Sequence, residues 1–86
     1  MSKDLIKKLS YLSHHRGMKE ADVLIGGFAD AYLNSLSLDE LSAWESLLGE
    51  NDNDLIDWLL DRKPRPEGIY LGLLDKLYDY TKQRTL

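Results

Sequence analysis

The sequence predicts an all-α fold, a compact bundle of five short helices. In five segments apolar residues recur at helical spacing, and residues that cap or break helices separate these segments. No segment shows the sustained alternation of apolar and polar residues that is typical of a half-buried strand. The 86 residues, 43% of them hydrophobic, are enough for one core. We therefore expect a single helical domain over residues 1–86.

The first two helices are predicted from their apolar faces. A stripe at helical spacing marks the first helix, which should end within residues 14–17; its members are Leu5, Ile6, Leu9 and Leu12. The second helix is expected over about residues 18–33, with a broad apolar face. Gly26 and Gly27 lie in its middle and should face away from the core. They would then be either neutral surface positions or part of a low-profile face against which a partner packs.

The remaining three helices are predicted from caps and breaks. Ser37 and Glu40 form the pattern of a capping box, which starts a third helix that ends before Gly49. A short, nearly all-apolar segment over 55–60 predicts a fourth helix. The prolines within 63–66 interrupt the pattern. The last helix is expected from about residue 67 to residue 82.

Composition excludes several classes of function. The net charge of −4 and the pI near 5.0 argue against nucleic-acid binding, which needs a basic surface. No apolar run approaches the roughly 18 residues of a membrane span, and the absence of cysteine excludes disulfides and thiolate chemistry. A helical pattern follows Met1 almost at once, so we expect no targeting peptide. The expected location is the bacterial cytoplasm, or the mitochondrial matrix for a processed eukaryotic form.

Motifs for metal binding or catalysis are not found. His14 and His15 are adjacent, so on a helix they point about 100° apart and do not easily share one metal ion. The acidic stretch 50–54 lacks the spacing and the glycine of a calcium loop. Its carboxylates, such as Asp52 and Asp54, are interpreted as helix caps and not as a catalytic pair. We therefore expect no enzyme activity, no catalytic residues and no metal site.

The stretch between the first two helical patterns contains Arg16, Gly17 and Glu20. Without a Cβ, Gly17 would tolerate positive φ and allow another backbone to approach closely. If the second helix has already begun, Arg16 and Glu20 lie on one face and can pair. Considered alone, these residues are typical of a C-cap glycine next to a solvated ion pair.

The order of motifs nevertheless resembles a known family. Arg16-Gly17-x-x-Glu20, with Met18 inside it and Asp22 two residues on, resembles the signature of the small FAD assembly factors of succinate dehydrogenase. Four further motifs follow in the family's order: Leu36-Ser37-x-x-Glu40-Leu41, Leu47-Leu48, Asp54-Leu55-x-x-Trp58 and Lys63-Pro64-x-Pro66. The resemblance covers about residues 8–68.

The resemblance implies the role of an assembly factor, or chaperone. Such a protein binds the flavoprotein subunit of succinate dehydrogenase and promotes flavinylation, the covalent attachment of FAD to a histidine of that subunit. The fumarate reductase flavoprotein is a further candidate partner. FAD then belongs to the partner, and we expect this chain to be a monomer with no tightly bound cofactor.

The resemblance also implies a partner-binding patch on the signature. Arg16 would bind a carboxylate of the partner through two hydrogen bonds, Gly17 would allow close approach, and Glu20 would hold a donor of the partner. Met18 lies within the patch, and Asp22 would support it through a local hydrogen bond.

Position 15 departs from the family pattern, which commonly has arginine or lysine there. His15 takes that place, and histidine changes its charge near neutral pH. If His15 contributes to the patch, partner binding should depend on pH between about 6 and 7.5.

Three rival functions remain open from the sequence alone, and one of them is a generic helical interaction domain whose match to the family motifs is a coincidence. A small acidic helical protein could be an antitoxin or another regulatory binding module, although it lacks a disordered tail. A free flavin carrier is the remaining rival, and it is disfavoured because no glycine-rich phosphate-binding loop follows a strand.

Overall fold

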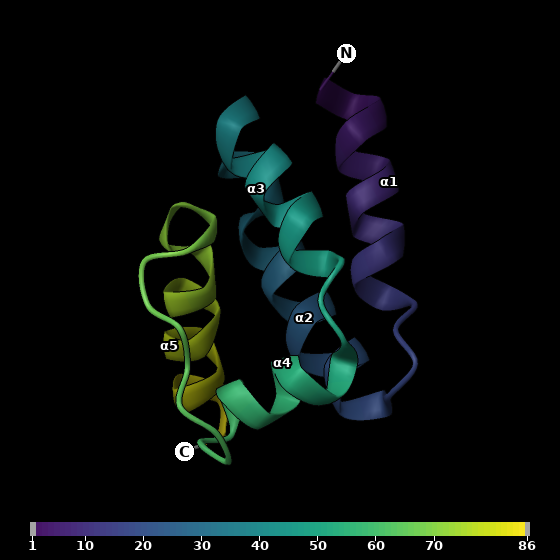
Figure 1. The fold of residues 1–86 in the computed structure, drawn as a ribbon. Helices are drawn as coiled ribbons and strands as arrows, with labels where there is room; N and C mark the ends of the chain where they lie inside the picture. The colour runs from purple at the N-terminus through teal and green to yellow at the C-terminus, as the bar shows by residue number, and fades with distance from the viewer. Residues whose placement is uncertain (1, 86) are drawn as a thin grey trace.

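The computed structural model describes residues 2–85 and confirms the all-α architecture. Five α-helices account for most of this range, and no strand occurs in it: α1 (Ser2–His14), α2 (Lys19–Tyr32), α3 (Leu38–Leu48), α4 (Asp52–Leu59) and α5 (Leu73–Thr85). Short 3₁₀ turns, Leu33–Ser35 and Tyr70–Gly72, follow α2 and precede α5. In Figure 1, α1, α2 and α3 lie side by side, α4 crosses one end of them, and α5 packs on the side away from α1.

All five helices contribute buried residues to one core. Phe28 of α2 and Trp44 of α3 are buried with their rings stacked, the centroids 5.0 Å apart. The indole N–H of Trp44 donates to the hydroxyl of Ser13 at 3.0 Å, and that hydroxyl donates to the carbonyl of Leu9 at 2.6 Å. A buried chain of hydrogen bonds therefore links α3 to the C-terminal half of α1.

Helix caps place the loop between α3 and α4. The capping box of Ser37 and Glu40 is confirmed, and the backbone N–H of Ser37 lowers the pKa of the Glu40 carboxyl. Helix α4 begins earlier than the sequence predicted, because Asn51 is its N-cap and accepts from the backbone N–H of Asn53 at 2.8 Å. Asp52 consequently lies in the first turn of α4.

The start of α5 differs from the prediction. The helix was expected from about residue 67 but begins at Leu73. Gly68 and Gly72 have φ of 76° and 79°, and Tyr70 and Leu71 have φ of 53° and 54°. These left-handed conformations are incompatible with a right-handed helix, so apolar spacing alone placed the start of the helix too early.

The prediction that Gly26 and Gly27 face away from the core is wrong. Gly26 is buried, and a Cβ built on it would lie 2.5 Å from Nδ1 of His14. A Cβ on Gly27 would lie 2.5 Å from the hydroxyl oxygen of Tyr80. The two glycines therefore receive side chains from α1 and α5, and the low-profile face proposed for a partner is covered from within the chain.

Candidate functional site

The signature turn, which we define as residues 15–18, connects α1 to α2. Helix α2 begins at Lys19, with Met18 as its N-cap residue in an extended conformation. Arg16 therefore precedes the helix, and the predicted pairing of Arg16 with Glu20 along one helix face is wrong. Gly17 is not among the glycines with positive φ, so the C-cap interpretation is also wrong.

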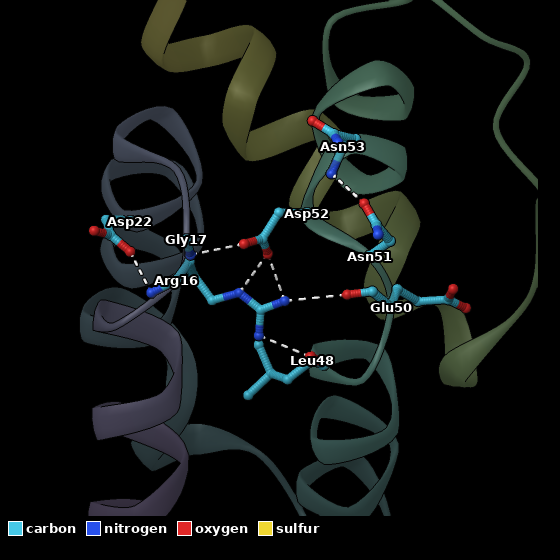
Figure 2. A network of polar contacts seen from close by, with 8 residues as sticks. All are labelled: Arg16, Gly17, Asp22, Leu48, Glu50, Asn51, Asp52 and Asn53. Atoms are coloured by element: carbon cyan, nitrogen blue, oxygen red, sulfur yellow. Dashed lines mark hydrogen bonds and ion pairs between the residues drawn. The ribbon is translucent and has the colours of Figure 1, made fainter.

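Arg16 is held by the loop between α3 and α4 (Figure 2). Its Nε donates to Oδ1 of Asp52 at 2.7 Å, and its Nη2 lies 2.6 Å from the same oxygen. Nη1 donates to the carbonyl of Leu48 at 2.7 Å, and Nη2 donates to the carbonyl of Glu50 at 3.1 Å. The Arg16 and Asp52 side chains are 11% and 19% exposed. All three guanidinium nitrogens are therefore engaged inside the chain, which does not fit the hypothesis that Arg16 binds a carboxylate of the partner.

Asp52 also holds the backbone of the signature turn. Its Oδ2 accepts from the backbone N–H of Gly17 at 2.7 Å, while its Oδ1 accepts from Arg16. A Cβ on Gly17 would lie 3.2 Å from Oδ2 of Asp52, a tight contact. The absence of a side chain thus lets the carboxylate approach the turn closely.

Sequence reasoning missed Asp52 as a site residue. It interpreted the acidic stretch as helix caps, and Asp52 is indeed in the first turn of α4. Its partner is 36 positions away in the sequence. No local spacing rule connects residues at that separation, so only the packing of the two loops reveals the pair.

Asp22 and Met18 close the turn from the side of α2. The carboxylate of Asp22 accepts from the backbone N–H of Arg16, which confirms the expected local hydrogen bond (Figure 2). The backbone N–H of Asp22 donates to the carbonyl of Met18 at 3.0 Å. The Met18 side chain is half-buried and packs against the core. Arg16, Asp22 and Asp52 thus hold the backbone of the turn from both sides.

Glu20 is exposed in the first turn of α2. Within residues 2–85, no hydrogen bond or ion pair engages its carboxylate. Arg16 does not neutralise Glu20, because its guanidinium is already paired with Asp52. Glu20 is therefore a solvent-facing carboxylate beside a turn whose backbone is fixed.

The two adjacent histidines diverge, as their spacing predicts. His14 lies over Gly26, and its Nε2 is 2.8 Å from Oδ1 of Asp30. His15 is exposed, and its ring stacks on that of Tyr11 with centroids 4.0 Å apart. The structure thus leaves His15, Gly17 and Glu20 exposed, whereas His14 is half-buried against α2.

A tyrosine supports the loop that binds Arg16. Tyr70 donates its hydroxyl proton to the carboxylate of Glu50, and this bond, together with burial and the negative charge, raises the pKa of Tyr70. The carbonyl of the same Glu50 accepts from Arg16. The left-handed turn before α5 therefore contacts the loop between α3 and α4, which accepts the hydrogen bonds of Arg16.

The described part of the chain offers neither a cluster of metal-binding side chains nor a helix suited to span a membrane. Residues 2–85 contain no group of three or more His, Cys, Asp or Glu side chains that could hold a metal ion. No helix in this range is both long enough and apolar enough to cross a membrane.

Comparison with known proteins identifies the family. Residues 7–81 match the model of the family described as "Flavinator of succinate dehydrogenase". A protein of Acetobacter pasteurianus named "FAD assembly factor SdhE" is 35% identical over 78 residues, which are 91% of this chain and 72% of that protein. "Succinate dehydrogenase assembly factor 2, mitochondrial" of Danio rerio is 40% identical over 83 residues, 93% of this chain and 52% of that protein.

A third relative extends the range of organisms. "Succinate dehydrogenase assembly factor 2, mitochondrial" of Dictyostelium discoideum is 34% identical over 82 residues, 95% of this chain and 58% of that protein. This chain therefore spans about half to three quarters of the length of these relatives. The family match includes the signature turn and the loop between α3 and α4, and it continues into α5. The chain belongs to the flavinator family of succinate dehydrogenase.

Proposed function

We propose that this protein is an assembly factor that binds the flavoprotein subunit of succinate dehydrogenase and promotes covalent attachment of FAD to it. The observation that carries the proposal is the family match over residues 7–81, which contains the complete signature. The relatives' names describe FAD assembly and succinate dehydrogenase assembly. No observation favours the antitoxin alternative. The fumarate reductase flavoprotein is a second candidate client.

The geometry supports a preformed contact surface on the signature turn. Arg16, Asp22 and Asp52 fix the backbone of the turn through hydrogen bonds and an ion pair. A rigid surface loses less conformational entropy on binding than a flexible one, so more of the contact energy appears as affinity. Gly17 and Glu20 are the signature residues exposed on this surface. In the proposal Arg16 positions the turn, and Glu20 contacts the partner.

The proposed role in flavinylation is to order the partner's site. The attachment would link the 8α position of the flavin to a histidine of the partner, and the flavin itself would supply the reactivity for this step. The partner holds the FAD. A bound helper accelerates this chemistry by holding the reacting groups and dipoles in position. The Glu20 carboxylate accepts a hydrogen bond from a donor of the partner and thereby fixes the local backbone of the complex.

Coexpression tests this proposal directly. The flavoprotein subunit is expressed with and without this chain, and covalent flavin is measured by in-gel fluorescence after denaturation. We expect a strong gain with the wild-type chain. Glu20→Ala should lower the rate of flavinylation by about tenfold or more, since hydrogen bonds to charged groups contribute roughly 1.5–3 kcal/mol.

Asp39→Ala is the matched control for Glu20→Ala. Asp39 is an exposed carboxylate in the first turn of α3, as Glu20 is in the first turn of α2. Both substitutions therefore remove a favourable interaction with a helix N-terminus. Equal losses of flavinylation in the two variants, or no gain with the wild-type chain, would contradict the proposal.

A further inference from the structure

A surface pocket lies directly beside Glu20. It has a volume of about 360 Å³ and an almost entirely apolar lining, and it is formed by Lys19, Glu20, Val23, Leu24 and Leu60. The first four residues belong to the start of α2, and Leu60 directly follows α4. Helices α2 and α4 are in contact, and α4 crosses the end of the bundle at which α2 begins (Figure 1). The pocket is therefore built on two packed helices and does not depend on a long loop.

We propose that this pocket receives one aliphatic side chain of the flavoprotein partner, next to a lysine or arginine of the partner that pairs with Glu20. The inference rests on the proposed function and names a second anchor for the same interface. Apolar pockets that become fully desolvated, surrounded by polar residues, are typical positions of binding hot spots.

The exposure of Val23 supports an intermolecular use. Val23 is 45% exposed, whereas the neighbouring Leu24 is 7% exposed and belongs to the core. Leu60 packs on the core while also lining the pocket. The floor of the pocket is thus supplied by side chains fixed through core packing. A partner side chain that fills it would bury the exposed part of Val23 without repacking the protein.

The negative charge of Glu20 indicates that a basic residue of the partner lies next to that aliphatic side chain. Glu20 is one of the lining residues, and its carboxylate has no hydrogen-bond or ion-pair partner within residues 2–85. The nearby Arg16 cannot supply a countercharge, because Asp52 and two backbone carbonyls engage it. Lys19 can line the pocket with its aliphatic stem while its ammonium group stays in water. A cation of the partner would therefore satisfy an acidic group that the chain itself leaves unpaired.

The pocket is also continuous with the signature turn. Glu20 belongs both to the signature and to the pocket lining, and Val23 is one helical turn further along α2. A partner segment that contacts Gly17 and Glu20 can therefore reach the pocket without leaving the surface. The volume of about 360 Å³ is near the lower end of the range for small-molecule sites, which is roughly 300–1,000 Å³.

The test measures the affinity of the purified chain for the purified flavoprotein subunit. Val23→Asp places a charge in the pocket and should weaken binding by at least about tenfold. Val23→Leu keeps an apolar side chain and should stay within about threefold of wild type. Leu38→Asp is the matched control, because Leu38 is 65% exposed on α3 and does not line the pocket. It should bind as wild type does.

The outcomes separate this inference from the proposed function. If the wild-type chain binds the flavoprotein and Glu20→Ala weakens binding, but Val23→Asp binds normally, the pocket inference is overturned and the proposed function stands. If the wild-type chain does not bind at all, both fail. If circular dichroism shows that Val23→Asp is unfolded, Val23→Thr, which keeps the shape of valine, replaces it. Val23→Thr should weaken binding by several-fold. Wild-type affinity of Val23→Thr would overturn the inference.

Two further measurements test whether a basic residue of the partner pairs with Glu20 and whether the partner, not a second copy of this chain, fills the pocket. Binding of the wild-type chain should weaken as salt rises, and Glu20→Gln should reduce this salt dependence, because it removes the charge that pairs with the partner's cation. An unchanged salt dependence would overturn the assignment of a basic neighbour. A wild-type homodimer that Val23→Asp dissociates, seen by light scattering, would assign the pocket to a second copy of this chain and overturn the partner assignment.

Discussion

Arg16 and Arg65 use similar chemistry in two different regions of the molecule. Their side chains are 11% and 19% exposed, and each pairs with a carboxylate in the first turn of a helix, Asp52 of α4 or Asp75 of α5. Arg16 adds two backbone carbonyls as acceptors. Arg65 instead lies over the ring of Tyr78, 3.9 Å from its centroid. Both arginines thus combine an ion pair with a second kind of contact.

The two pairs differ in the distance that they span in the sequence. Arg16 and Asp52 are 36 positions apart and connect two loops, whereas Arg65 and Asp75 are 10 positions apart and order the segment before α5. Asp75 also accepts from the backbone N–H of Gly68, at 3.3 Å. The long-range pair therefore determines the geometry of the candidate site, and the short-range pair ties the segment before α5 to the first turn of that helix.

The largest expected effect in this comparison comes from Asp52→Ala. It leaves the guanidinium of Arg16 without its countercharge and the N–H of Gly17 without its acceptor, so the free energy of unfolding should fall by about 2–4 kcal/mol. Urea denaturation measures this loss. Flavinylation should fall as well, even at a temperature at which the variant is folded, because the signature turn is released.

Asp52→Asn is the control for this prediction. Asparagine keeps an oxygen that accepts one hydrogen bond but loses the charge, so its stability should lie between those of wild type and Asp52→Ala. A loss of less than about 0.5 kcal/mol for Asp52→Ala, within the range of ordinary surface substitutions, would show that the pair does not hold the turn.

A smaller effect is expected from Arg65→Ala. The variant loses the ion pair with Asp75 and the stacking on Tyr78, which together should lower the free energy of unfolding by about 1–2 kcal/mol. Flavinylation should remain close to wild type while the protein is folded, since Arg65 does not contact the signature turn. A flavinylation defect as large as that of Asp52→Ala would remove the distinction between the two regions.

The smallest effect concerns acid stability. The hydrogen bond from Arg65, followed by that from the backbone N–H of Gly68, holds the pKa of Asp75 below its ordinary value of 3.8. Because the folded pKa is lower than the unfolded one, the contribution of Asp75 to stability is fully present above about pH 4 and is lost as pH falls through the folded pKa. Asp75→Asn should therefore be less stable than wild type near neutral pH, with the difference shrinking below about pH 4. Thermal melts between pH 2.5 and 6 would detect this, and a constant difference would contradict it.

The helices themselves were predictable because their signals are local. The capping box of Ser37 and Glu40 and the apolar stripe of α1 each lie within one helix, where a few residues decide the conformation. The start of α5 was not predictable in this way. Tyr70 and Leu71 adopt left-handed conformations that non-glycine residues rarely occupy, and Tyr70 is held there by a hydrogen bond to Glu50, 20 positions away.

The location of the candidate site was predictable from the sequence. Which of its residues bond within the chain and which face the solvent was not. The signature identified residues 16–22, and the local bond of Asp22 to the turn is confirmed. The contact of Glu20 with a partner stays a prediction. The role of Arg16 changed because its acceptor lies in a loop that no spacing rule connects to it. The pocket beside Glu20 was invisible for the same reason, since Leu60 reaches it only through the packing of α4 on α2.

Local spacing and residue identity were enough to predict the presence and order of the five helices, the position of the signature and its resemblance to the flavinator family. The tertiary structure decided which signature residues face the solvent. A guanidinium can pair with any carboxylate within reach, and sequence does not reveal which one is near. The packing of the α3–α4 loop against the signature turn brings Asp52 to Arg16, and it thereby leaves Glu20 free.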